Sequence, residues 1–170
     1  MKFFVSFLFA IISITVAAEP NRCEIYLQIE EQAKCTQRKK DHSHYLTDFG
    51  YAYCHQFTQA AESWDPELQL FIKSVAKCLQ EDVIANFAKG YSCKKVENDA
   101  FFKAHPRCYY QTGFCQLSFE QKFQVINEAT SFGLIFKPKV SILLTSKLFY
   151  SLYKNCNSRS PDVYTNSKNH

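Results

Sequence analysis

The chain has 170 residues, of which 46% are hydrophobic, and it contains 16 Phe and 10 Tyr. Only 4 Gly and 5 Pro occur, which argues against a β-rich fold with many tight turns. The net charge of +4 is too small to indicate nucleic acid or an anionic membrane as a partner. Length and composition therefore predict a single domain with ample apolar material for a core.

Residues 1–18 (MKFFVSFLFAIISITVAA) have the pattern of a secretory signal peptide. Lys2 supplies the positive charge, an apolar and hydroxyl-bearing run follows, and small residues at its end fit a signal peptidase site. The run is shorter than a transmembrane anchor, the structural alternative, and no later segment is apolar enough to cross a bilayer. We therefore expect a secreted, extracellular protein that enters a compartment where disulfides persist.

Three segments precede the clearest helix. Residues 22–34 predict a short helix, although the spacing of their aliphatic residues also fits an alternating strand. Residues 36–49 are polar and charged and predict a loop. Residues 50–63 contain apolar residues again and predict a further helix.

The clearest helical signal lies between Asp65 and Gly90. Asp65 can cap the free N–H groups, Pro66 is tolerated at the first helical position, and Gly90 suits the end of the helix. Apolar residues recur between them at spacings of three and four, in one stripe that contains Leu68, Phe71, Ile72, Val75, Cys78, Leu79, Val83 and Phe87. This pattern predicts a helix that buries one face and presents Cys78 to a second helix.

The C-terminal half also predicts helices. Residues 95–104 form one helical segment, which we expect to stop at His105-Pro106. Ser118 and Gln121 have the spacing of a capping box, which predicts the start of the next helix. We expect Gly133 to end this helix, whose predicted apolar face contains Phe119, Phe123, Ile126 and Ala129.

Residues 141–154 predict the last helix, and residues 157–170 are polar and predict a disordered tail. The predicted fold is therefore all-α: a disulfide-stapled helical domain of about five or six helices that spans residues 19–156. The chain contains eight cysteines, an even number that allows four disulfides with no free thiol. They are Cys23, Cys35, Cys54, Cys78, Cys93, Cys108, Cys115 and Cys156.

No metal, cofactor or catalytic site is expected, and we predict that the protein is not an enzyme. His42 and His44 lie near Asp41 and Asp48, but three or four ligands would have to converge within a predicted loop. The chain has no calcium-binding loop of the EF-hand type. Its acidic pairs are expected to be solvated helix faces, and they are Glu30-Glu31, Glu81-Asp82 and Glu97 with Asp99.

Five cysteines and their neighbours follow a specific pattern from Tyr51 to Cys115. The pattern contains CHQFTQAA (residues 54–61), FIKSVAKCL (residues 71–79), Val83, Phe87, Cys93, Cys108-Tyr109 and Cys115. It resembles the stanniocalcin family, which has Cys-x-Ser-Phe with Ala-Ala, then Phe-Val-Lys-Glu-Ser-Leu-Lys-Cys-Ile, Val-x3-Phe, Cys, Cys-Tyr and Cys at similar spacings. Weaker similarity extends over residues 22–156.

The resemblance implies a disulfide pairing. The pairs carried over from the family are Cys23–Cys35, Cys78–Cys108 and Cys115–Cys156. The family has two further N-terminal cysteines, the usual partners of the positions of Cys54 and Cys93, and both are missing here. We therefore expect Cys54 and Cys93 to pair with each other.

The resemblance also bears on assembly. Vertebrate stanniocalcins form covalent dimers through a cysteine closer to the C-terminus, whereas only a polar tail follows Cys156 in this chain. No disulfide-linked dimer is therefore expected, and a noncovalent dimer remains possible.

The resemblance implies a hormone-like signalling protein that regulates calcium and phosphate homeostasis by binding a receptor or another extracellular protein. An alternative is a secreted lipid-binding module of saposin type, which would need wide apolar helix faces around a cavity. A secreted hydrolase is least expected, because no convergent Asp and His site is evident in the sequence.

Overall fold

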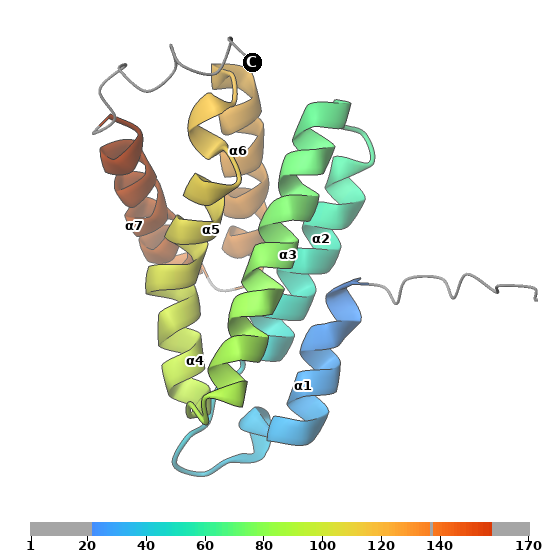
Figure 1. Cartoon of the computed structure of the whole chain (residues 1–170), viewed down its shortest axis with the longest axis vertical. Coiled ribbons are helices and arrows are strands. Elements are labelled where there is room, and N and C mark those ends of the chain that lie inside the picture. The colour runs from blue at the N-terminus through green and yellow to red at the C-terminus, as the bar shows by residue number, and fades with distance from the viewer. Residues whose placement is uncertain (1–21, 137, 158–170) are drawn as a thin grey trace, which may run out of the picture.

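The computed structural model describes residues 22–136 and 138–157, and every regular element in these residues is helical (Figure 1). The elements are α1 (Ile25–Ala33), π-helix η3 (Tyr45–Tyr51), α2 (Ala52–Ala61), α3 (Pro66–Ala88), α4 (Cys93–Asp99), π-helix η4 (Ala100–Ala104), α5 (His105–Gln111), α6 (Phe119–Phe136) and α7 (Pro138–Asn157), with short 3₁₀ turns at Arg22–Glu24, Cys35–Gln37 and Phe114–Gln116. The segment from α4 to α5 is one continuous helical rod, so the described part has six rods, as the sequence predicts. The expected signal peptide (1–18) and residues 158–170 of the expected tail lie outside the described residues.

Helix α3 lies at the centre of the domain, and local signals explain its two ends. Asp65 caps its start, because one carboxylate oxygen accepts a hydrogen bond from the Leu68 N–H at 2.9 Å. Gly90 follows its end with φ +74°, a conformation that glycine adopts without strain. The predicted stripe is confirmed in the buried residues Leu68, Phe71, Ile72, Val75, Leu79 and Val83.

Two clusters of buried side chains share α3. The first cluster is built on residues 68–79 of α3 and includes Phe57, Tyr109 and Phe114 from other elements. The second is built on Val83 and includes Tyr26, Tyr45, Leu46 and Val96. Because one helix runs through both clusters, the domain has one continuous support for two cores.

Four disulfides tie the rods together, and no cysteine is free. The pairs are Cys23–Cys54, Cys35–Cys93, Cys78–Cys108 and Cys115–Cys156. The third joins α3 to α5, and the fourth joins the turn before α6 to the end of α7. These two bridges are those that the resemblance implies, and the chain holds no further cysteine for a bridge between copies.

The expected pairs Cys23–Cys35 and Cys54–Cys93 are wrong. Helix α1 separates Cys23 from Cys35, and its 9 residues alone span roughly 14 Å at 1.5 Å per residue. A disulfide requires its two Cα atoms to lie within about 7 Å. Cys23 therefore pairs with Cys54 in α2, and Cys35 pairs with Cys93 at the start of α4.

Residues 36–49, expected to be a loop, are partly helical. Residues 38–44 are irregular, but η3 begins at Tyr45. Tyr45 and Leu46 are buried in the second cluster, and this burial stabilises η3. The polar residues that precede η3 give no sign of a helix, which is why a loop is expected from the sequence.

Two expected helix ends are also absent. The rod continues through His105-Pro106, because η4 shifts the hydrogen-bond register there and the His105 N–H donates to the Ala100 carbonyl five residues earlier. This wider turn relaxes the conflict between the proline ring and the preceding turn. Helix α6 runs past Gly133 to Phe136, and α7 begins at Pro138. A proline ring disfavours the helical conformation in the residue before it, so one continuous helix through this point is disfavoured.

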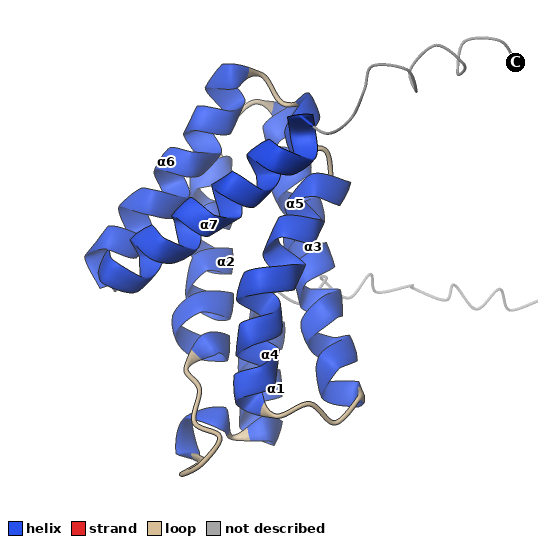
Figure 2. Cartoon of the chain, turned by 90° about the vertical axis from the view of Figure 1, so that its left-hand side faces the viewer, coloured by secondary structure: helices blue, strands red, loops and turns tan. Residues whose placement is uncertain are grey.

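Helices α6 and α7 form an antiparallel hairpin, and α7 also packs against α5 (Figure 2). The predicted capping box at the start of α6 is confirmed. The Ser118 N–H donates to the Gln121 side-chain oxygen at 2.9 Å, and the Gln121 N–H donates to Ser118 Oγ at 3.1 Å.

The revised pairing can be tested by peptide mapping. Trypsin cleaves after Lys34, which separates Cys23 from Cys35 in the sequence. Under non-reducing conditions we expect mass spectrometry to find Cys23 linked to Cys54 and Cys35 linked to Cys93. A peptide that links Cys23 to Cys35 would contradict this arrangement.

Replacing Cys35 and Cys93 together by alanine should lower the free energy of unfolding by about 4 kcal/mol.

Gly50 is required where η3 crosses α1. A Cβ atom on this residue would lie 2.5 Å from Cδ1 of the buried Tyr26 ring. Gly50→Ala should therefore lower the free energy of unfolding, measured in urea, by about 1–3 kcal/mol. Tyr26→Leu removes the ring, so the double variant should lose less stability than the sum of the two single losses. Additive losses would show that this contact is not the cause.

Candidate functional site

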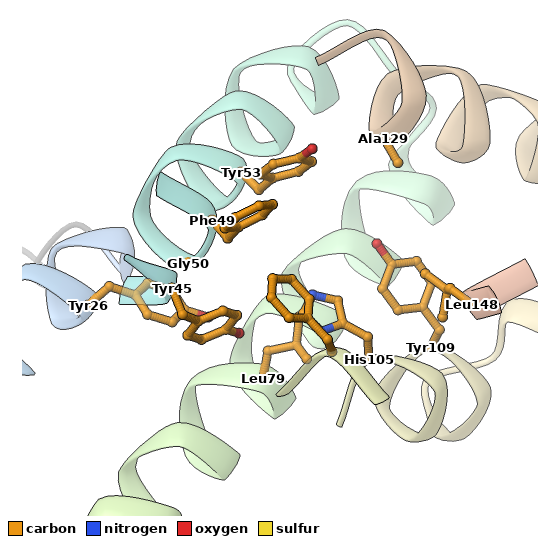
Figure 3. Close-up of a pocket in the computed structure, with 11 residues that line it drawn as sticks. Tyr26, Tyr45, Phe49, Gly50, Tyr53, Leu79, His105, Tyr109, Ala129 and Leu148 are labelled. Atoms are coloured by element: carbon orange, nitrogen blue, oxygen red, sulfur yellow. The ribbon is translucent and has the colours of Figure 1, made fainter. Parts of the chain in front are cut away.

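An aromatic pocket lies where the two core clusters meet (Figure 3). Its volume is about 100 Å³. The lining consists of Tyr26, Tyr45, Phe49, Gly50, Tyr53, Leu79, Phe101, His105, Tyr109, Ala129 and Leu148. These residues come from α1, η3, α2, α3, η4, α5, α6 and α7, so the pocket exists only when the whole domain is assembled.

Both π-helices contribute to this pocket. Tyr45, Phe49 and Gly50 lie in η3, Phe101 lies in η4, and His105 follows η4 directly. A π-helical turn inserts an extra residue and changes the direction of the side chains around it, and such turns occur frequently at functional sites. The two irregular segments therefore aim their rings at the same space.

The rings support one another through edge and face contacts. Phe49 and Phe101 meet edge to face, with centroids 4.9 Å apart and an angle of 86°. Tyr45 meets Phe101 in the same way at 5.2 Å, and Phe49 stacks on Tyr53 at 5.7 Å. These separations lie in the favourable range for aromatic pairs, so the wall of the pocket is a rigid assembly of rings.

The polar groups of the pocket are uncharged near neutral pH. His105 Nδ1 lies 2.7 Å from the Ala100 carbonyl, and because a carbonyl only accepts, Nδ1 carries the proton. Burial lowers the pKa of His105, and this effect exceeds the opposing influence of the Ala100 carbonyl and Asp82. Burial also raises the pKa of Tyr45 and Tyr109, so both remain phenols.

The histidines and carboxylates considered in the sequence have structural partners. His42 and His44 lie with their Nε2 atoms 2.9 Å apart, and Asp48 lies 3.9 Å from His44 Nδ1. Asp41 instead caps α4, accepting hydrogen bonds from the N–H groups of Cys93 at 2.6 Å and Lys94 at 2.9 Å. Partial burial raises the pKa of Asp41, but these bonds lower it overall. Across the described residues, no three His, Cys, Asp or Glu side chains gather as metal ligands would.

The acidic pairs are partly engaged in contacts within the protein. Glu30 accepts hydrogen bonds from the N–H and hydroxyl of Thr36, at 2.9 and 2.6 Å. Asp82 pairs with Arg107 and so links α3 to α5. Asp99 pairs with Lys103 at 2.7 Å. These three carboxylates therefore stabilise helix ends and helix contacts.

The predicted apolar face of α6 is only partly correct. Ala129 packs against the first cluster as expected, whereas Phe119 is 82% exposed and Phe123 is 61% exposed. Val125, which the predicted face did not include, is fully buried. On α7, Tyr150 and Tyr153 are 71% and 69% exposed. We call these four side chains the bridge aromatics, because Phe119 follows Cys115 by four residues and Tyr153 precedes its partner Cys156 by three.

Sequence reasoning missed the pocket because it treated residues 36–49 as a loop. A signal was present: Tyr45, Leu46 and Phe49 have the spacing of one helix face that continues into α2. Phe101 and His105 have the matching spacing of four residues on the opposite rod. Which of these faces meet could not be read from either segment alone.

No protein-family model matches this chain, and neither does any curated protein or solved structure. No described helix is both long enough and apolar enough to span a membrane.

The lowered pKa of His105 predicts a pH dependence of stability. The unfolded chain takes up a proton at this histidine below about pH 6.5, while the folded protein resists protonation. Its contribution to stability is therefore present above that pH and is lost as the pH falls below it. In urea unfolding at pH values on either side, His105→Gln should lose less stability on acidification than the wild type. An equal loss of stability on acidification in this variant and in the wild type would show that burial of His105 is not the cause.

Proposed function

We propose that this chain is a secreted, non-enzymatic, hormone-like protein of the stanniocalcin type, which regulates calcium and phosphate homeostasis by binding a receptor or another extracellular protein. The single observation that carries the binding role is the group of bridge aromatics on a helix pair held by a disulfide. The resemblance of residues 51–115 to that family carries the physiological part of the proposal.

The disulfide framework supports the proposal in two ways. Four intramolecular bridges are typical of proteins that fold in an oxidising compartment. The bridges Cys78–Cys108 and Cys115–Cys156 agree with the pairing that the resemblance implies, within and next to the segment where it is strongest.

The exposed rings are suited to binding another protein. Large aromatic side chains bury much area on contact and are frequent among the residues that dominate protein interfaces. Phe119 and Phe123 are four residues apart on α6, so they lie on the same side of the helix. Exposing two such rings to water has no benefit for folding, which favours a role in association.

The base of α6 is held before any partner arrives. The capping box fixes its first turn, and Lys122 Nζ donates to the Cys115 carbonyl at 3.0 Å. The Gln121 amide also reaches Asp65 and Glu67 at the start of α3, at 3.3–3.4 Å. A surface already ordered in the free protein loses less entropy on binding.

Saposin-type lipid binding remains the alternative prediction, and the aromatic pocket does not support it. The aromatic pocket, at about 100 Å³, is smaller than the cavity of about 150 Å³ that holds benzene in a well-studied protein. It is therefore not a cavity for an acyl chain.

The proposal predicts saturable binding to intact cells. The labelled mature protein should bind at the surface of responsive cells and change their uptake of calcium or phosphate. Phe119→Ser combined with Phe123→Ser should weaken this binding at least about tenfold, the loss expected for two central interface residues. Dose–response curves of binding and ion uptake would measure both effects.

Phe102→Ser provides the matched control, because Phe102 is also an exposed phenylalanine but lies in η4 beside Lys147. It should bind as the wild type does. Equal binding by the double variant would remove the bridge aromatics from the interface. Saturable binding without any change in ion uptake would instead remove the role in ion balance.

A further inference from the structure

The aromatic pocket has no part in the proposed partner-binding surface, and its chemistry points to a ligand of its own. Its deep wall consists of the buried residues Tyr26, Tyr45, Gly50, Leu79 and Tyr109. The remaining lining residues are half-buried and form its outer part. The pocket lies at the junction of the two clusters and is bounded by two π-helices. The side chains there are therefore packed less densely than in the interior of a core.

The rings define the shape of the space. On one side, Phe49 and Tyr53 lie nearly parallel, at 12°. On the other side, His105 lies at 24° to both Phe101 and Tyr109. Phe49 lies toward one end of the space, and Ala129 and Leu148 lie toward the other (Figure 3). Phe49 also contacts Phe101 edge to face. Because Phe49 and Phe101 meet at 86°, the two walls stand nearly at right angles. An aromatic guest that stacks against one wall would meet the other edge to face, and both are favourable ring geometries.

The lining also determines the charge of a guest. None of the eleven lining residues carries a carboxylate, an ammonium or a guanidinium group. An ion would therefore lose its hydration without gaining a counter-charge, which is costly in a buried site. A neutral molecule avoids this cost.

A hydrogen-bonding group on the guest would find a partner. Figure 3 shows the hydroxyl of Tyr109 pointing into the space below Ala129, with Tyr53 on the opposite side of that space. Burial and, to a smaller extent, Tyr53 raise the pKa of Tyr109. Its hydroxyl therefore keeps its proton and can donate a hydrogen bond.

We propose that this pocket is a binding site for a small, uncharged, planar aromatic molecule with one hydrogen-bonding group, of the size of phenol. A cavity of about 150 Å³ accommodates benzene, and this pocket of about 100 Å³ would hold one ring after small movements of its outer residues. The site is independent of the bridge aromatics, so ligand binding and partner binding can succeed or fail separately.

The test is a titration of the full mature protein with phenol, followed by methyl NMR. We expect saturable shifts of the Leu79, Ala129 and Leu148 methyl signals, while those of Leu68 and Val96 stay in place. Tyr109→Phe should weaken the affinity about fivefold, the effect of one neutral hydrogen bond. Tyr110→Phe is the matched control, because Tyr110 does not line the pocket, and it should bind phenol as the wild type does.

Further probes separate the outcomes. Tetramethylammonium should not shift these methyl signals, and binding of this cation in place of phenol would overturn the proposal. Ala129→Leu should fill the outer part and abolish the shifts, and Leu148→Phe serves the same purpose if the first variant does not fold. An absence of saturation with phenol, or shifts scattered over the surface, would show that the space is only a packing void.

Discussion

The Cys78–Cys108 bridge fixes the central helix α3 against the rod that contains α4 and α5, and the rest of the domain is built around this pair. Helix α3 runs through both clusters of buried side chains, so its position determines where each core forms. The Asp82–Arg107 ion pair adds a second link between the same two elements, 4 residues along α3 from Cys78 and next to Cys108 on α5. Covalent and polar contacts thus hold one helix pair in register.

The other bridges join the remaining rods to this pair or to neighbouring elements. Cys35–Cys93 anchors the end of α1 at the start of α4, and Asp41 caps the same helix end. Cys115–Cys156 closes the α6–α7 hairpin at its base. Each disulfide therefore joins two elements that are distant in sequence, which restricts the unfolded chain strongly and leaves little freedom between rods in the folded one.

This arrangement has two consequences for function. A domain held at its helix ends can expose large aromatic rings without losing its shape, as the bridge aromatics do on α6 and α7. It can also tolerate incomplete packing where its two cores meet, which leaves the aromatic pocket. The first feature suits recognition of a protein, and the second suits a small neutral ring. They lie on different parts of the domain and need not act together.

The sequence by itself determined the helical class, the bounds of α3 and the start of α6, because caps and apolar periodicity act over a few residues. It also indicated the oxidised state of the cysteines, although not all of their partners. Only the tertiary structure decided that Cys23 meets Cys54 and Cys35 meets Cys93. The same holds for the exposure of Phe119 and for the two π-helices that form the pocket. These features depend on how distant segments pack, and no local pattern in the chain encodes that packing.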